Sequence, residues 1–428
     1  MRSTIVSRSA AAAKAQNKAA SLKTKLSNGL SVVAQDNNGA VSQLVLAFRA
    51  GSRYQASNQQ GLVHHIRNFV GRDAQSYPGL QLVWSSAASG ANLSSFATRD
   101  IFGVQISVAR DHAAYALSIL GHLAAKPAFK PWELEDVAPT ILADLSQKTP
   151  YQIVFEDIHR AAFRNDSLSF SLFSSKREVG AYKSDELSKF AEKHFVSGNG
   201  VLVGVNVDGE ILKNYAEESG SIADGRLITN HEAPFRGGDY RRFARGNDVH
   251  IIVAGSGAPI GNLKARATQA VFLAHIGRVS PLKFASIPGS TSGLSTLPSG
   301  VVGSSFQASY DGSGLVGAYL LASGANADGA VRAAVDALKT PKVQDIEGCK
   351  RRAINEVLFN AENTVFSAYE HATNALHKGP EQSELIAEIQ KVQPKDVEQF
   401  ATTAFKRLAI AAYGSHGRVP YSDELPSV

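Results

Sequence analysis

The most diagnostic stretch of this 428-residue chain is Gly61-Leu62-Val63-His64-His65-Ile66-Arg67-Asn68. Its apolar residues recur with helical spacing, so we expect a helix that begins near Gln60. Residues three and four positions apart lie on one face of a helix, which places His64, Arg67 and Asn68 together. His65 points about 100° away from His64, so the two histidines cannot chelate one ion together.

His64, Arg67 and Asn68 have the spacing of the zinc-peptidase motif H-x-x-E-H, with two of its residues replaced. In that motif two histidines hold zinc, and the glutamate between them is the general base. Here His64 fills the first ligand position, Arg67 the base position and Asn68 the second ligand position. A guanidinium cannot accept a proton from zinc-bound water, and an amide is a poor zinc ligand. We therefore predict a peptidase fold with no catalytic residue and no metal site.

The sequence also contains an internal repeat. The helical pattern Leu187-x-x-Phe190-Ala191-x-x-x-Phe195 recurs 210 positions later as Val397-x-x-Phe400-Ala401-x-x-x-Phe405, and an apolar strand follows both copies. At the same offset, Ser94-Ser95-Phe96-Ala97 recurs as Ser304-Ser305-Phe306-Gln307. Landmarks in one order with a nearly constant offset predict two homologous domains of about 200 residues each.

Each half has the pattern of an α+β unit, in which a mixed or antiparallel sheet packs against helices. Asn28-Gly29 between two apolar runs predicts a hairpin with a type I′ turn at the start of the first unit. We place the N-terminal domain at 21–225, a Gly- and Pro-containing linker at 226–245 and the C-terminal domain at 246–428.

Composition narrows the class of protein. The first acidic residue is Asp36, and residues 1–18 contain four basic residues among Ser and Ala. Such an N-terminus is typical of a mitochondrial transit peptide, which we place at 1–20, although a disordered tail would share this composition. Without these four charges the net charge falls from +6 to +2, which gives no support for nucleic-acid binding. The single cysteine, Cys349, excludes an intramolecular disulfide.

The first half resembles the opening of the pitrilysin-type, mitochondrial processing peptidase family. The resemblance is carried by Thr24-x-Leu26-x-Asn28-Gly29-Leu30-x-Val32, Gly51-Ser52-Arg53-Tyr54 and Gly61-x-x-His64. It implies the inverted zinc-peptidase fold, with a third zinc ligand, a glutamate, on a later helix. Asp144 stands at that position with a side chain one methylene shorter. We expect Asp144 to be a helix-surface acid that faces Arg67 rather than a zinc ion.

In the second half, residues 305–317 resemble the core proteins of ubiquinol–cytochrome c reductase, respiratory complex III, which are degenerate members of the same family. This resemblance implies a noncatalytic assembly subunit without a cofactor, peripheral to the matrix side of the inner mitochondrial membrane. The implied partners are core protein 1, cytochrome b, other complex III subunits and a second copy in the dimeric complex.

Three other functions stay open from the sequence. The first is the noncatalytic, substrate-binding alpha-type subunit of the mitochondrial processing peptidase. The second is an active zinc metallopeptidase. The third is a nucleotide-dependent enzyme, because Gly255-x-Gly257-x-x-x-Gly261 lies between an expected strand and an expected helix. This glycine pattern misses the dinucleotide fingerprint by one residue, and no acidic residue follows at the expected distance.

Overall fold

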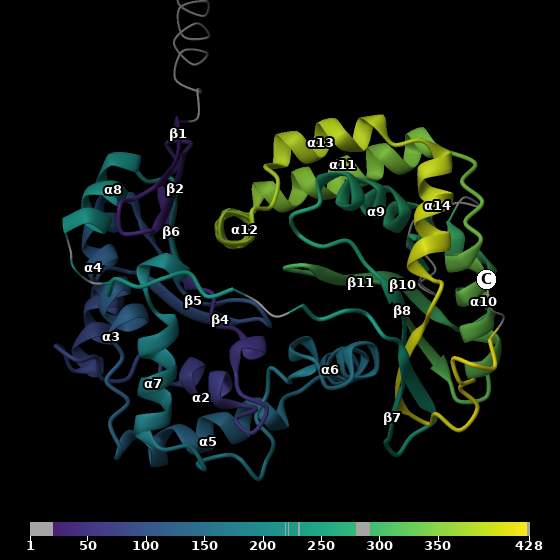
Figure 1. Ribbon diagram of the computed structural model, residues 1–428, viewed down its shortest axis with the longest axis horizontal. Helices are drawn as coiled ribbons and strands as arrows, with labels where there is room; N and C mark the ends of the chain where they lie inside the picture. The colour runs from purple at the N-terminus through teal and green to yellow at the C-terminus, as the bar shows by residue number, and fades with distance from the viewer. Residues whose placement is uncertain (1–19, 219, 221, 230–231, 280–291, 426–428) are drawn as a thin grey trace, which may run out of the picture.

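The computed structural model describes residues 20–218, 220, 222–229, 232–279 and 292–425. Except for Ala20, the predicted transit peptide at 1–20 lies outside the described residues. The described chain forms two open mixed sheets with helices packed on both (Figure 1).

The first sheet has the strand order β1-β2-β6-β3-β5-β4. Its strands are Ala20–Lys25 (β1), Ser31–Asp36 (β2), Val41–Phe48 (β3), Asn92–Ala97 (β4), Phe102–Ala109 (β5) and Gly200–Val205 (β6). β2 and β6 run parallel, whereas the other neighbouring pairs run antiparallel.

The second sheet has the order β7-β12-β8-β11-β10-β9. Its strands are Gly238–Phe243 (β7), Asp248–Ser256 (β8), Arg278–Val279 (β9), Val302–Tyr310 (β10), Ser313–Ser323 (β11) and Ala409–Gly414 (β12). β7 and β12 are its parallel pair. Position by position, β7-β12-β8-β11-β10 therefore repeats β2-β6-β3-β5-β4 in order and direction. This confirms the predicted α+β fold with two homologous units. The domain boundaries stay a prediction, and β7 lies inside the segment assigned to the linker.

Helices cover both sheets. Those of the first half are Leu62–Asn68 (α2), Gly79–Ala88 (α3), Ala113–Ala125 (α4), Glu133–Ser146 (α5), Pro150–Phe163 (α6), Ser184–His194 (α7) and Gly209–Glu218 (α8). Those of the second half are Leu263–Ile276 (α9), Ala327–Lys339 (α10), Ile346–Glu362 (α11), Thr364–His377 (α12), Gln382–Lys391 (α13) and Pro394–Ala404 (α14). Short 3-10 turns lie at Ser52–Tyr54, Arg110–His112, Ser167–Ser169, Ser197–Asn199 and Gly293–Thr296. Among the described residues, no helix has the length and hydropathy needed to span a bilayer.

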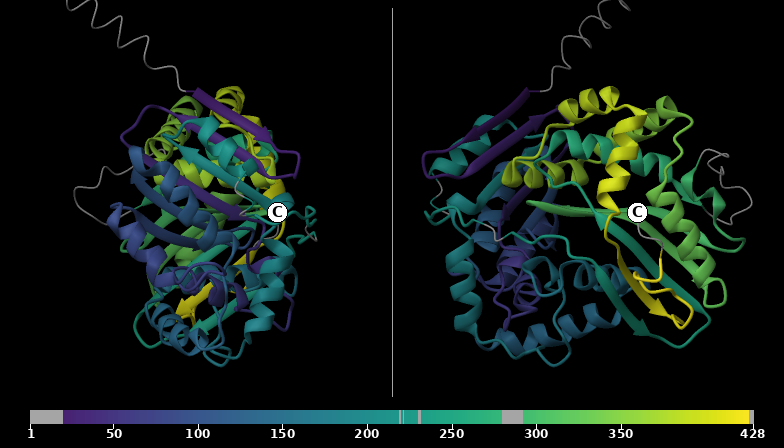
Figure 2. Two further views of the ribbon diagram at one scale, coloured as in Figure 1. Left: turned by 90° about the vertical axis from the view of Figure 1, so that its left-hand side faces the viewer. Right: turned by 45° about the vertical axis from the view of Figure 1, so that its right-hand side comes forward.

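The two halves exchange a helix. α6 belongs to the first half but packs on β7, β8 and β12 of the second sheet, whereas α12 of the second half packs on β2, β3 and β6 of the first (Figure 1). The turned views show the C-terminal helices next to the N-terminal hairpin (Figure 2). The α6 contacts form a buried apolar cluster that includes Val154, Ile158, Ala162, Ile252, Ala254 and Ala411. The α12 contacts form a second cluster that includes Ala368, Ala372, Val33, Val45 and Val203. Each half thus completes the apolar core of the other.

The N-terminal hairpin forms at the predicted place but with another turn. Gly29 has a φ of +92°, whereas Asn28 is not among the residues with positive φ. The Gly29 N–H donates to Leu26 O, and the Leu26 N–H donates to Leu30 O, both at 2.9 Å. A type I′ turn needs positive φ at both central residues, so that prediction is wrong. Instead, the Asn28 side chain accepts a hydrogen bond from the Leu30 N–H at 3.1 Å, and glycine alone takes the left-handed position.

Candidate functional site

The diagnostic stretch forms the short helix α2, which begins after Gly61. Gly61 has a φ of +96°, and a Cβ at this position would lie 2.6 Å from Ser174 Cα. Only glycine fits this backbone conformation and this approach without strain. Leu62, Val63 and Ile66 are buried in the core of the first half, which fixes α2 against α5. This packing brings Asp144 of α5 to α2.

His64, Asn68 and Asp144 form one cluster. His64 Nε2 lies 3.2 Å from Asp144 Oδ2. The Asn68 amide donates to the same oxygen at 3.4 Å and to His64 O at 2.9 Å. The prediction that Asp144 faces Arg67 is wrong, because its bonded partners are His64 and Asn68. His64 and Asn68 lie one turn apart on one face, and both offer N–H donors to the carboxylate.

The His64 ring has a defined tautomer. The Ser174 backbone N–H donates to His64 Nδ1 at 3.2 Å, so Nδ1 carries no proton. The proton of the neutral ring is therefore on Nε2, from which it is donated to Asp144. Burial lowers the pKa of His64 to about 4, against the opposing effect of Asp144, so the ring is neutral near pH 7. A zinc ligand needs the lone pair of Nε2, with Nδ1–H donating to an outer partner. The hydrogen bond from the Ser174 N–H instead keeps Nδ1 unprotonated and the proton on Nε2.

His65 has the complementary tautomer. Its Nδ1 donates to Gly61 O at 2.8 Å, and its Nε2 accepts a hydrogen bond from the Gly180 N–H at 3.2 Å. The ring packs edge-on against Tyr182, with centroids 4.8 Å apart. Both ring nitrogens are therefore used by the fold, and His65 lies away from the cluster as predicted.

The loop Ser171–Ser175 covers the cluster. Phe173 packs edge-on against the His64 ring at 5.4 Å, and Lys148 Nζ lies 3.8 Å from the centroid of the same Phe173 ring. His64 is 1% exposed as a result. Sequence reasoning missed Phe173, Ser174 and Lys148. No motif could have signalled Ser174, because its contribution is a backbone N–H.

These residues do not fit zinc. Asp144 and His64 are conventional ligand types, but Asn68 offers an amide in the place of the second histidine. In the part of the chain that the structure describes, no group of three or more His, Cys, Asp or Glu side chains could hold a metal ion. Arg67 forms no ion pair with Asp144 among these residues.

The glycines of the 255–261 stretch have a packing role. A Cβ at Gly255 would lie 2.3 Å from Ala404 O, and one at Gly257 would lie 2.6 Å from the Leu315 backbone. Gly257 also donates its N–H to Gly314 O at 2.8 Å. Close approach to the chain's own backbone therefore explains glycine at both positions, and this argues against a nucleotide loop.

A buried ionic contact joins the two halves. Arg53 Nη1 lies 2.6 Å from Asp100 Oδ1, and Asp100 Oδ2 accepts a hydrogen bond from the Asp311 N–H at 2.9 Å. Asp311, in the turn between β10 and β11, also pairs with Arg49 at 3.3 Å. His377, whose Nδ1 lies 3.4 Å from Asp311 Oδ2, lowers the pKa of Asp311 to about 2 together with the nearby arginines. This contact fixes the β10–β11 turn against the first half.

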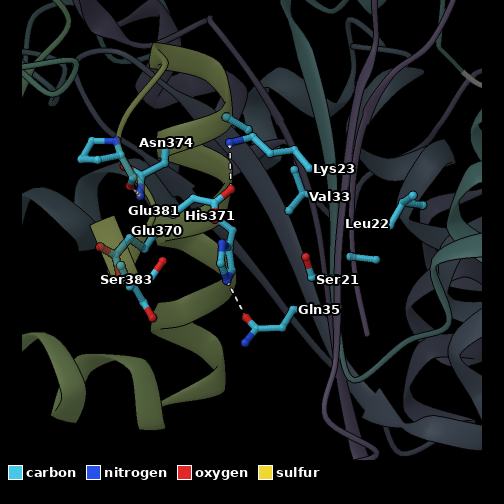
Figure 3. Close-up of a pocket in the computed structure, with 14 residues that line it drawn as sticks. Ser21, Leu22, Lys23, Val33, Gln35, Glu370, His371, Asn374, Glu381 and Ser383 are labelled. Carbon is cyan, nitrogen blue, oxygen red and sulfur yellow. Dashed lines mark hydrogen bonds and ion pairs between the residues drawn. The ribbon is translucent and has the colours of Figure 1, made fainter. Parts of the chain in front are cut away.

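A second contact between the halves lines a cavity of about 250 Å³ between β1–β2 and α12–α13 (Figure 3). His371 points across it toward Gln35, with Nε2 2.7 Å from Gln35 Oε1 (Figure 3). Lys23 and Glu381 form an ion pair at 3.4 Å across the same cavity. Both side chains of that pair are exposed, so it contributes little to stability.

Comparison with known proteins shows what this chain is similar to. The model of the insulinase family (peptidase family M16) matches residues 31–176, which include the whole His64 cluster. The chain is 28% identical over 420 residues to human "Cytochrome b-c1 complex subunit 2, mitochondrial", covering 94% of this chain and 91% of the relative. It is 26% identical to "Mitochondrial-processing peptidase subunit alpha-2" of Dictyostelium discoideum, covering 88% of each. Residues 31–176 of the chain thus match the insulinase family (peptidase family M16), and nearly its whole length is similar to subunit 2 of the mitochondrial cytochrome b-c1 complex.

Proposed function

We propose that this chain is a noncatalytic structural subunit, of the core protein 2 type, of ubiquinol–cytochrome c reductase. In that role it supports electron transport from ubiquinol to cytochrome c without itself carrying a cofactor. The observation that carries the proposal is the similarity to subunit 2 of human, rat and mouse over 94% of this chain and 91% of each relative. The processing-peptidase alpha subunit of Dictyostelium matches with lower identity and coverage.

The geometry of the His64 cluster supports the absence of catalysis. Arg67 stands in the position of the general base, and Asn68 stands in the position of a zinc ligand. The Ser174 N–H also donates a hydrogen bond to His64 Nδ1. The proton of the ring is therefore on Nε2, the nitrogen that would have to bind zinc. Elemental analysis of the purified chain tests this directly. We expect no stoichiometric zinc, whereas one zinc per chain with chelator-sensitive peptide cleavage would overturn the proposal.

The proposed location is the matrix side of the inner mitochondrial membrane, with peripheral attachment. The proposed partners are core protein 1, cytochrome b, the other subunits and a second copy in the dimeric complex. The mitochondrial relatives and the acid-free N-terminus support this location. Carbonate extraction of mitochondrial membranes, combined with protease access from each side, would test it.

A second candidate is the noncatalytic alpha-type subunit of the mitochondrial processing peptidase. The match to the Dictyostelium alpha-2 subunit favours this candidate, because it also spans most of both chains. The two candidates differ in how the protein is extracted. A subunit of the reductase leaves the membrane in mild detergent as part of a complex with haem-containing subunits, whereas the alternative predicts a soluble heterodimer that binds presequences.

A further inference from the structure

A second cavity lies beside the His64 cluster, where the start of α6 meets the second sheet. It has a volume of about 780 Å³, and α5, α6, the loop that covers His64, β7 and β12 contribute to its wall. Its charged side chains are Lys148, Glu156, Arg160, Lys176, Glu178 and Arg242. A cavity of this size is within the range of ligand pockets, about 300–1,000 Å³.

Two acidic groups at this cavity, Glu156 and the neighbouring Asp157, are paired with arginines, whereas Glu178 accepts a hydrogen bond from the Ser175 N–H at 3.1 Å. Glu156 receives hydrogen bonds from Arg99 and from the Leu172 N–H, each at 3.0 Å. Asp157, next to it on α6, receives two hydrogen bonds from Arg242, at 2.6 and 3.1 Å. Arg242 is therefore neutralised by Asp157, and Glu156 by Arg99.

Two partly buried cations at the cavity, together with the exposed Lys176, form no ion pair with a carboxylate in the described part of the chain. Lys148 Nζ lies over the Phe173 ring at 3.8 Å, and Arg160 Nη1 donates to the Tyr240 hydroxyl at 3.2 Å. Among the residues that the structure describes, neither cation forms an ion pair with a carboxylate. Both side chains are only partly exposed. Taking a charge out of water without an opposite charge is unfavourable, so an anion between them would be stabilised.

We propose that this cavity binds a ligand that carries oxyanion groups, carboxylate or phosphate, through Lys148 and Arg160. Two sources share this chemistry: an acidic peptide segment and a small free polyanion. The inference goes beyond the structural role proposed above, because it requires no other subunit and no catalysis.

The ionisation of Lys148 agrees with this geometry. Burial is the main cause that lowers its pKa to about 8, and Arg242 and Arg160 act in the same direction. Glu156 and Asp157 oppose the shift. A bound anion would favour the charged ammonium and raise the pKa again. Binding should therefore weaken as the pH rises above about 8, and also as ionic strength increases.

The test is calorimetric titration of the purified full-length chain at low ionic strength. The probes are a hexaglutamate peptide, citrate and inorganic phosphate. The variants are Lys148→Met and Arg160→Gln, which remove one charge each, and Lys148→Arg, which keeps it. Lys189→Gln is the matched control, because Lys189 is an exposed lysine on α7 at a different cavity. Thermal melting of every protein, with and without probe, shows whether it is folded.

We expect saturable binding of at least one probe to the wild-type chain. Because a charge-assisted hydrogen bond is lost, Lys148→Met and Arg160→Gln should each weaken binding roughly tenfold, whereas Lys148→Arg and Lys189→Gln should stay within about twofold. Binding of hexaglutamate alone identifies a peptide site, and equal or tighter binding of citrate or phosphate identifies a small-anion site. The proposal is wrong if no probe binds saturably or raises the melting temperature of the wild type. It is also wrong if folded Lys148→Met and Arg160→Gln bind as tightly as the wild type.

Discussion

His64 Nε2 lies 3.2 Å from Asp144 Oδ2, and the Ser174 backbone N–H donates a hydrogen bond to the other ring nitrogen, Nδ1. Two side chains at ligand positions of the zinc-peptidase motif thus make a direct hydrogen bond with each other. The tautomer that stabilises this contact is the one that cannot bind zinc through Nε2.

This tautomer predicts the outcome of restoring the motif. Arg67→Glu and Asn68→His together would supply the missing base and ligand. We still expect no stoichiometric zinc, because a ligating histidine without its outer hydrogen-bond acceptor loses about 10–100-fold in metal affinity. Zinc content after dialysis measures this, with the unchanged chain as control. Tight zinc binding together with robust proteolysis by the double variant would show that the covered site is otherwise intact.

The buried Arg53–Asp100 pair should contribute strongly to stability. Both side chains are almost fully buried, so Asp100→Asn removes the carboxylate that lies 2.6 Å from the Arg53 guanidinium. We expect a loss of about 3–5 kcal/mol in the free energy of unfolding. The matched control is Asp328→Asn, whose partner Arg332 is exposed, with an expected loss below about 1 kcal/mol. Urea unfolding measures both, and similar losses for the two variants would contradict the importance of the buried pair.

The exchanged helix α6 predicts coupling between the halves. Ile158 of α6 is fully buried in the cluster on the second sheet. Ile158→Ala should cost about 2–5 kcal/mol because it leaves a cavity. Ile211→Ala, at a position 42% exposed, should change stability by less than about 0.5 kcal/mol. Because α6 completes the core of the other half, we expect Ile158→Ala to shift one common transition. Separate unfolding of the two halves would contradict the coupling.

Buried neutral histidines predict loss of stability in acid. Burial lowers the pKa values of His64 and His194 to about 4 from the model-peptide value of 6.5. The unfolded chain therefore binds more protons than the folded chain between about pH 6.5 and 4, so stability falls as the pH falls through this window. We expect His64→Gln to reduce this pH dependence by about 1–3 kcal/mol. Urea midpoints at several pH values measure it. A stability that is flat over this window in the wild type would contradict the account.

Much of the fold could be predicted from the sequence, because the repeated patterns lie on matching elements. Phe190 and Phe400 lie on α7 and α14, and Phe96 and Phe306 lie on β4 and β10. The helical spacing also placed His64 and Asn68 on one face. Three features depend instead on tertiary packing between distant segments. They are the hydrogen bond from His64 to Asp144, the packing of Phe173 over the His64 ring, and the exchange of α6 and α12 between the halves. Spacing along the chain carries no signal for these contacts.

The most direct test of the central claim is the behaviour of the chain in mitochondrial membranes. Membranes are solubilised in mild detergent and separated on a density gradient, and the chain is followed with the haem spectrum and ubiquinol–cytochrome c reductase activity. We predict that the chain migrates with both. Its recovery in a soluble, haem-free heterodimer that binds presequences would contradict the account.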